Sequence, residues 1–237
     1  MINKLALMLL DVFDFFHKKK IINFLKRKKV NHLKSFFDIG AHQGESIELF
    51  TRNFLIEKIY SFEPSKENFE ILLKKIKYIN LKETKLTIEN YALGEKTKEQ
   101  ILFQTTESSS STINRINKNS KYFKKKNFFL NLKKETPISI KQTKLSDYIK
   151  KNNIRNLDFI KIDTEGYEYF VLLGAEQYLK EFKYIIFEHH YDDMIQKKYK
   201  FSQISKILKE NGFQQMLKLK MPLRKTFEYI YFNKKVL

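Results

Sequence analysis

The stretch SFFDIGAHQGES, residues 35–46, decides the fold class that this sequence predicts. An apolar run ends at Asp38, and Gly40 and Gly44 follow it, four residues apart. This order is typical of a buried strand, a turn without bulky side chains and then a helix. Because small residues let a ligand approach the main chain, we expect a binding site at this turn. The Asp38 carboxylate favours a cofactor with an amino group or a sugar hydroxyl over a pyrophosphate.

Strands and helices alternate along most of the remaining chain. Further strands are predicted over 58–64, 85–93, 157–163 and 184–190, and helices over 44–54, 65–79, 144–152, 169–182 and 201–213. Residues 213–220 and 227–235 read as an antiparallel pair. The alternation predicts an α/β fold with a mostly parallel sheet covered by helices on both faces, and ligands bind such sheets beyond the carboxyl ends of the strands.

Two parts of the chain stand outside this alternation. Residues 1–33 form an N-terminal helical segment, which leaves 34–237 as the main domain. Within that domain, residues 99–143 contain two alternating stretches separated by a polar run and then a basic and aromatic run. Since this segment has no core of its own, we interpret it as an inserted hairpin with a long loop.

The composition narrows the possible partners. The chain of 237 residues has a net charge of +19 and no cysteine, which excludes disulfides and thiolate zinc sites. Such a charge favours binding to polyanions. However, only five of the 46 basic residues are arginine, the better ligand for phosphates and bases, so we expect no nucleic-acid partner.

The N-terminal segment combines an apolar stretch, residues 5–16, with a basic stretch, residues 17–29. The apolar part is too short to span a bilayer, which takes about 20 residues. It can lie on an anionic membrane surface or pack on its own domain, and both interpretations remain open. We expect a cytoplasmic protein, either free or peripheral to the inner membrane.

Two further motifs suit a nucleoside. Glu63 ends the second predicted strand, 25 residues after Asp38, where an acidic side chain can accept hydrogen bonds from a ribose diol. The alternative is a favourable charge at the start of the next helix. Ala92 and Leu93, at the end of the third strand, can border an adenine ring or simply pack in the core.

Carboxylates and histidines gather after the later strands. Asp163, Glu165 and Glu168 lie close together in sequence, which is costly unless a cation, a hydroxyl or an amine offsets the repulsion. Helix capping by Asp163 or Thr164 is the structural alternative. His189 and His190 follow on the next strand and can act as a base, or can join Asp163 and Glu188 in holding a divalent ion. Adjacent residues on a strand point to opposite faces, so we expect one histidine to face the site.

The ordered set FFDIGAHQGES, YSFEP, NYALG, TKLSDYI, LDFIKIDTEGYEYFVLLGA and IIFEHH resembles the FkbM-type S-adenosylmethionine-dependent methyltransferases, over residues 34–235. The resemblance implies a class I, Rossmann-like methyltransferase fold, with a seven-stranded sheet whose last strand is antiparallel. It implies O-methylation of a hydroxyl, often on a sugar. It also assigns the cofactor-binding residues, which would be Asp38, Gly40, Ala41, His42, Gly44, Glu63, Ala92 and Leu93.

The acceptor side is less defined by this resemblance. The run from Ser108 to Thr112 resembles the serine-rich loop of the family, which makes Ser110 and Ser111 candidates for substrate contact. His42 stands where the family often has Asn, and Thr164 and Tyr167 also depart from its pattern. The basic run 118–134 would cover the acceptor or would be a solvated loop.

We therefore expect an S-adenosylmethionine-dependent O-methyltransferase acting on a small molecule or on a sugar in a surface glycan or glycolipid. The candidate catalytic residues are Asp163, Glu165, His189 and His190. A divalent metal ion and the oligomeric state are left open. The alternatives are an RNA methyltransferase or RNA-binding protein using the basic surface, a nicotinamide-dependent oxidoreductase (although the third glycine of its fingerprint is missing) and a scaffold without catalysis.

Overall fold

A computed structural model describes residues 2–105, 110–130 and 135–236 of the chain. Its main feature is a seven-stranded sheet with the order β3-β2-β1-β7-β8-β10-β9. Only β10 runs against its neighbours, β8 and β9, and the other neighbouring pairs are parallel. The strands are β1 (His32–Ile39), β2 (Leu55–Phe62), β3 (Lys85–Glu89), β7 (Phe159–Ile162), β8 (Tyr184–His190), β9 (Phe213–Lys220) and β10 (Thr226–Asn233). The predicted fold class is confirmed.

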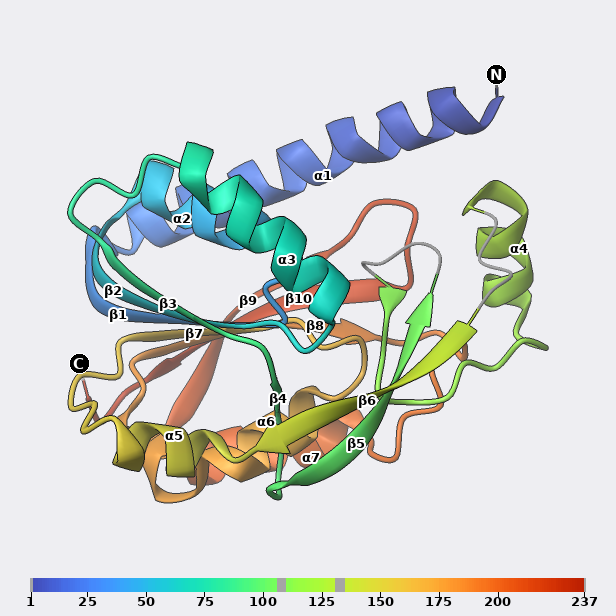
Figure 1. Ribbon diagram of the computed structural model, residues 1–237. Helices are drawn as coiled ribbons and strands as arrows, with labels where there is room; N and C mark the ends of the chain where they lie inside the picture. Colours follow the sequence, from blue (N-terminus) through green and yellow to red (C-terminus); the bar gives the residue numbers. More distant parts are fainter. Residues whose placement is uncertain (1, 106–109, 131–134, 237) are drawn as a thin grey trace.

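Helices cover both faces of this sheet (Figure 1). On one face lie α1 (Ile2–Arg27), α2 (Glu45–Asn53) and α3 (Lys66–Lys75), the last continued by the short 3-10 helix η1 (Ile76–Tyr78). On the other lie α5 (Leu145–Lys151), α6 (Glu168–Ala175), the 3-10 helix η3 (Glu176–Glu181) and α7 (Phe201–Glu210). The segment 1–33 contains a single long helix, and the first half of this helix extends past the edge of the sheet (Figure 1). His32 and Leu33 already belong to β1, so the main domain begins before residue 34.

The central strand β1 shows why the sheet is enclosed. Its burial increases along its length until the last five residues are all buried. Successive side chains point to opposite faces, so Phe36 stacks on Phe50 of α2 while Phe37 packs against Phe182 on the other side. Burying an aromatic side chain on each face stabilises both layers, by about 1.5–3 kcal/mol per residue.

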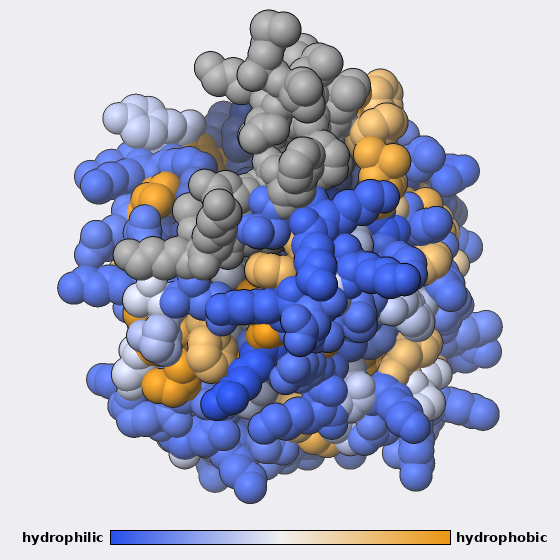
Figure 2. Space-filling model, turned by 90° about the vertical axis from the view of Figure 1, so that its right-hand side faces the viewer, coloured by the Kyte–Doolittle hydropathy of each residue, from blue (hydrophilic) through white to orange (hydrophobic). Residues whose placement is uncertain are grey.

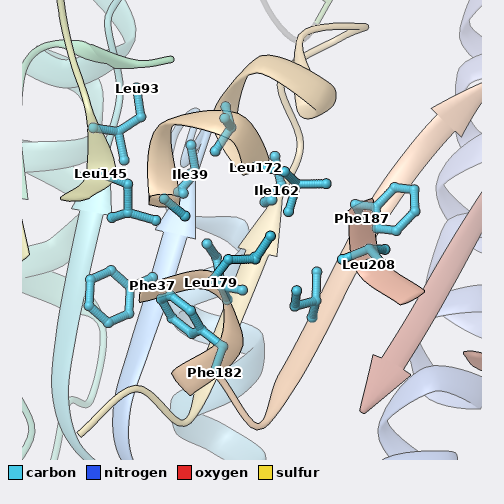
Figure 3. Close-up of a cluster of buried hydrophobic side chains, with 14 of the residues drawn as sticks. Phe37, Ile39, Leu93, Leu145, Ile162, Leu172, Leu179, Phe182, Phe187 and Leu208 are labelled. Carbon is cyan, nitrogen blue, oxygen red and sulfur yellow. The ribbon is translucent and has the colours of Figure 1, made fainter. Parts of the chain in front are cut away.

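The largest hydrophobic cluster of the described residues lies between the sheet and the helices α5 to α7 (Figure 3). Phe37 and Ile39 of β1, Ile162 of β7 and Phe187 of β8 contribute to it from the strands. Fixing the carboxyl ends of these neighbouring strands in one packed layer fixes the loops that follow them. This is the edge where ligands bind in α/β sheets.

The insertion is built around a second, three-stranded sheet. Its order is β4-β6-β5, formed by β4 (Ala92–Leu93), β5 (Lys98–Thr105) and β6 (Glu135–Thr143), and β5 pairs with β6 in antiparallel register. Two expectations need correction here. The strand predicted over 85–93 is split, because the chain leaves the main sheet after Glu89 and β4 joins the small sheet.

The loop expected over 118–134 is also wrong in part, because a helix forms within it. Its residues 121–130 form the helix α4 (Lys121–Leu130), and residues 131–134 lie outside the described part of the chain. Ser120 begins this helix, since its hydroxyl accepts a hydrogen bond from the Phe123 N–H at 3.2 Å. The same hydroxyl donates to Asp193 at 2.7 Å, which ties the helix to the main domain.

Candidate functional site

A cavity of about 480 Å³ opens at the carboxyl ends of β1, β2, β7 and β8. Its volume is in the range of small-molecule and cofactor sites, roughly 300–1,000 Å³. The wall comes from the turn after β1, the loop after β7, helices α1 and α2, and the small sheet. Most of the residues predicted from sequence to bind a cofactor line this cavity, namely Gly40, Ala41, His42, Glu63, Ala92 and Leu93.

The turn after β1 is closely packed and needs its glycines. Gly40 has a φ of +79°, and a side-chain carbon there would lie 1.9 Å from the carbonyl oxygen of Asp163. Gly44 has a φ of +93°, and a side-chain carbon there would lie 2.7 Å from Leu72. The backbone N–H groups of Gly40 and Ala41 both donate to the carbonyl of Phe62 at 3.0 Å. The turn is therefore fixed against the end of β2, with bare main chain facing the cavity.

Glu63 joins this turn to the end of β2. Its carboxylate accepts the His42 N–H at 2.8 Å and the Ser65 N–H at 2.9 Å. Burial raises the pKa of Glu63 to about 7, although these N–H donors oppose the shift. The side chain is thus held rigidly at the cavity, where it can accept further hydrogen bonds from a ligand.

Asp38 does not line the cavity, unlike the residues that follow it. It is fully buried at the end of β1, and neither of its carboxylate oxygens has a hydrogen-bond partner among the described residues. Burial raises its pKa to about 6, against the attraction of Lys161, whose Nζ lies 3.8 Å from Oδ1. Asp38 therefore lies behind the turn, and its carboxylate affects the cavity through its charge and not as part of the wall.

Lys161 is a functional candidate that the sequence analysis missed. It lines the cavity from β7, and its Nζ lies 3.1 Å from Oδ2 of Asp163. Burial alone would raise the pKa of Asp163, but the attraction of Lys161 outweighs this and lowers it. A lysine inside the apolar strand FIKI was the available signal, because buried lysines are rare unless paired.

Glu165 and Glu188 line the cavity beyond Asp163 and enclose His190. The Nε2 atom of His190 lies 3.1 Å from Glu165 and 3.4 Å from Glu188, and Thr226 Oγ1 lies 3.1 Å from its Nδ1. Burial lowers the pKa of His190, but attraction to Glu165 and the other carboxylates raises it well above 6.5. Burial and the repulsion of Asp163 raise the pKa of Glu188 well above 4.5.

The structure does not bring His189 to this group. Its ring packs among Tyr191, Tyr199 and Phe201 on the opposite face of β8, with ring centroids 4.8–5.9 Å apart. Burial lowers its pKa to about 3, so it is neutral at physiological pH. The alternation of side chains along the strand thus places His190, and not His189, on the side of the carboxylates.

Glu168 serves to hold the loop after β7. It is fully buried and accepts hydrogen bonds from the Gly166 N–H at 2.8 Å and from the Thr164 hydroxyl at 3.2 Å. The hydroxyl of Tyr199 donates to its other oxygen. Of the three clustered carboxylates, Asp163 and Glu165 line the cavity, whereas Glu168 fixes the backbone between them.

The two candidate serines also differ in whether they line the cavity. Ser111 lines the cavity, and its hydroxyl accepts the Thr105 N–H at 3.2 Å. Ser110 is buried outside the cavity lining, and Lys126 of α4 donates to its hydroxyl at 2.6 Å. Ser108 and Ser109 lie outside the described residues. The insertion is also bonded to the loop after β7, because the Thr112 hydroxyl donates to the Glu165 carbonyl at 2.6 Å.

Helix α1 forms part of the cavity wall, which no local sequence signal indicated. Asp14, His17, Lys18 and Ile21 line it. His17 Nε2 lies 2.8 Å from Oε2 of Glu228, and the Arg224 guanidinium lies 2.8 Å from Asp14. These pairs join α1 to the β9–β10 hairpin, more than 200 residues away in sequence.

Metal ligation is not indicated by the described side chains. Over residues 2–105, 110–130 and 135–236, no group of three or more His, Asp or Glu side chains is arranged to hold a metal ion. In the same part of the chain, no helix has both the length and the apolar character needed to cross a bilayer.

Comparison with solved structures identifies the fold. Methyltransferase FkbM from Methylobacillus flagellatus KT aligns with a TM-score of 0.55 and 19% identity, covering 84% of this chain and 43% of that chain. Magnesium protoporphyrin IX methyltransferase from Synechocystis PCC 6803 with bound SAH has a TM-score of 0.53 and 10% identity, covering 95% and 85% of the two chains. TrmK from M. capricolum, in complex with S-adenosyl-homocysteine, has a TM-score of 0.52 and 10% identity, covering 92% and 68%.

The sheet order, the single antiparallel strand and these likenesses define a class I, Rossmann-like methyltransferase fold. The family model described as the methyltransferase FkbM domain matches residues 38–214, which is most of the chain. The chain therefore belongs to the FkbM methyltransferase family. It spans less than half the length of the Methylobacillus protein. A search of curated proteins gave no significant match.

Proposed function

We propose that this chain transfers a methyl group from S-adenosylmethionine to a hydroxyl oxygen of a sugar in a surface glycan or glycolipid. One observation carries the proposal. A single cavity has the bare glycine turn and Glu63 at one part of its wall and the carboxylates Glu165 and Glu188 at another. It therefore has room for a cofactor beside groups that can accept a proton. Membership of a methyltransferase family supports the reaction class.

The residues present fit this cofactor. Gly40 leaves main chain exposed where a side chain would collide, and Glu63 presents a fixed carboxylate. Asp38 holds two buried oxygens without hydrogen-bond partners near the same turn. Glu63 would hold the ribose, the turn from Gly40 to Gly44 would hold the methionine end, and Ala92 and Leu93 would border the adenine. When bound, the cofactor supplies a methyl group on a positively charged sulfur.

The chain's own chemical task is to accept the proton of the hydroxyl. A sugar hydroxyl is a poor nucleophile, so a base within hydrogen-bond distance accelerates its methylation. Asp163 is a weak base because Lys161 lowers its pKa. We assign the task to Glu165 on its position, because it lines the cavity and its carboxylate is held 3.1 Å from Nε2 of His190. His190 orients that carboxylate and offsets its charge.

Titration calorimetry with S-adenosylmethionine and S-adenosylhomocysteine tests the cofactor. We expect both to bind the wild type, and Glu63→Gln to weaken binding by roughly 10- to 100-fold, because hydrogen bonds to a charged group contribute about 1.5–3 kcal/mol. The control is Glu57→Gln, an exposed residue earlier on the same strand β2, which should not affect binding. If neither compound gives binding heat with the wild type, the proposal is overturned.

The acceptor needs a separate test. Mass spectrometry of glycans and glycolipids from cells with and without this protein should show one species that differs by a single methyl group. Complementation with Glu63→Gln should fail to restore it, whereas Glu57→Gln should restore it. Finding the difference only in RNA would favour the alternative function.

An RNA methyltransferase is the second candidate, and the net charge of +19 favours it. A gel-shift titration with transfer RNA decides between them. Tight binding that persists at physiological salt supports the RNA function. Weak binding that disappears between low and physiological salt reflects charge alone and supports the glycan acceptor.

A further inference from the structure

Helix α1 exposes a group of large apolar side chains that the domain does not cover. Val12, Phe13, Phe15 and Phe16 are 43%, 39%, 62% and 54% exposed. The other exposed large apolar residues of the described chain stand singly in the sequence, and single exposed apolar residues are normal in folded proteins. Four such residues within five positions form a local patch.

The spacing of these residues places them on the outward side of α1. Val12 and Phe16 are four residues apart, and Phe13 and Phe16 three apart, so they are neighbours on one face. The opposite face is occupied by Asp14 and His17, which line the cavity and pair with the β9–β10 hairpin. The patch therefore points away from the domain, and the domain cannot bury it without releasing both pairs.

Exposed basic side chains follow the patch along α1 and are also found on α4, which contacts α1. Lys19 and Lys20 are exposed on the next turn of α1, and a shallow depression further along is lined by Lys20, Asn23, Lys26 and Arg27. Helix α4 contacts α1 and presents further exposed lysines, Lys121, Lys124 and Lys125. At the end of the molecule where α1 and α4 lie, hydrophilic side chains cover most of the surface around separate apolar patches (Figure 2).

We propose that this aromatic and basic face of α1 docks on the surface of an anionic lipid bilayer. Phenylalanine side chains on one face of a helix insert into the headgroup region, and the lysines around them attract anionic lipids. A second copy of the chain is a poorer occupant. Two such faces would bring like charges together, which is costly in a protein with a net charge of +19.

Docking in this orientation has a consequence for the acceptor, and this part rests on the proposed function. The helix that would contact the bilayer lines the cavity with Asp14 and His17 on its other face, so the width of one helix, about 10 Å, would separate the cavity from the headgroups. The acceptor hydroxyl belongs to a sugar attached to a membrane lipid, rather than to a free glycan.

Vesicle sedimentation of the full chain tests the docking. We expect binding to vesicles that contain phosphatidylglycerol, weaker binding at higher salt, and little binding to phosphatidylcholine alone. Lys19→Gln/Lys20→Gln should weaken the binding by about 30-fold, because each lysine near an anionic surface contributes about 1 kcal/mol. Phe15→Ser/Phe16→Ser should weaken it at least tenfold. The matched control is Leu73→Ser, an exposed apolar residue of α3, which should not change it.

Three results would overturn the docking. The first is no binding of the wild type to anionic vesicles at low salt, and the second is binding of the Phe15→Ser/Phe16→Ser variant that equals that of the wild type. The third is a wild-type dimer that forms without lipid and is lost in this variant. Calorimetry with S-adenosylmethionine, done without vesicles, keeps the two proposals separate. A chain that binds the cofactor but not vesicles disproves the docking and leaves the proposed function intact.

The acceptor part has its own test. Membranes isolated from cells that lack this protein should become labelled when the purified chain and S-adenosylmethionine with a labelled methyl group are added. The Phe15→Ser/Phe16→Ser variant should transfer the label more slowly, although its cofactor binding is unchanged. Label that enters only the soluble fraction would overturn the lipid-linked acceptor.

Discussion

The imidazole Nε2 of His190 lies 3.1 Å from Oε2 of Glu165, joining the end of β8 to the loop after β7. Both atoms are buried. Glu188 lies 3.4 Å from the same nitrogen, and Asp192 lies 3.7 Å from the other ring nitrogen. One histidine is therefore the local positive charge for three carboxylates, and this explains why attraction outweighs burial in raising its pKa.

The stability that His190 contributes should depend on pH. A raised pKa in the folded state means that the contribution is fully present below pH 6.5 and is lost as the pH rises through the higher folded value. We expect His190→Gln to lower the free energy of unfolding by about 3 kcal/mol at pH 6, and by less once the pH has risen through the raised folded-state pKa. Urea unfolding at several pH values measures this difference. His32→Gln is the control, because its pair with Glu57 is half exposed. A difference that stays constant with pH would contradict the assignment.

Gly40→Ala should damage both the fold and the site. The new carbon would lie 1.9 Å from the Asp163 carbonyl, so the turn must move away from β7. We expect a lower melting temperature and loss of S-adenosylmethionine binding by calorimetry. Gly212→Ala is the matched control, since Gly212 also has a positive φ, of +92°, but the atoms nearest to an added carbon there belong to the side chains of Asn233 and Lys235. It should cost about 1–2 kcal/mol while cofactor binding stays intact. Normal cofactor binding by Gly40→Ala would disprove the role of the turn.

Lys161→Met should be strongly destabilising. It leaves Asp38 and Asp163 facing each other without a cation, and removal of one partner of a buried ion pair costs roughly 3–5 kcal/mol. The double variant Lys161→Met/Asp163→Asn should recover part of this loss, because it also removes one buried charge. Chemical unfolding of the two variants tests this. If the double variant is as unstable as the single one, lost packing and not charge explains the effect.

Asp38 and Glu63 should make the ligand-free protein less stable as the pH rises. Their pKa values, about 6 and about 7, are raised by burial, so the stability they contribute is present below pH 4 and is lost as the pH passes 6 to 7. Raising a pKa by one unit on folding corresponds to about 1.4 kcal/mol of stability. Thermal melts from pH 4 to 8 should show a smaller decline for Glu63→Gln and Asp38→Asn than for the wild type. Parallel profiles for all three proteins would contradict these shifts.

Local chemistry made much of the fold predictable. The run SFFDI ends in a glycine turn, and burial on both faces follows from its unbroken apolar character, as in parallel sheets. The helix predicted over 65–79 begins as α3 directly after Ser65, whose hydroxyl caps it by accepting the Asn68 N–H at 3.4 Å. Ser120 gave the same signal for α4, but the lysine-rich sequence after it was interpreted as a loop.

The site was predictable in part. Spacing placed Glu63 beside the turn after β1, because parallel strands end at the same edge of the sheet. Alternation along β8 indicated that one of His189 and His190 would face the other candidates, without deciding which. The register between β8 and its neighbour β10 pairs Thr226 with His190, and the Thr226 hydroxyl also contacts the His190 ring. His190 is therefore the histidine on the side of the carboxylates.

The sequence by itself determined the elements that depend on near neighbours: strands, helices, the glycine turn and the carboxylates that follow strands. Only the tertiary structure decided which distant groups meet. It brought Lys161 between Asp38 and Asp163, and it closed the cavity with Asp14 of α1, held by Arg224. The physical reason is that spacing along a chain fixes periodicity and caps, whereas contacts across some 200 residues are selected by the burial of whole helix and sheet faces, which no short stretch encodes.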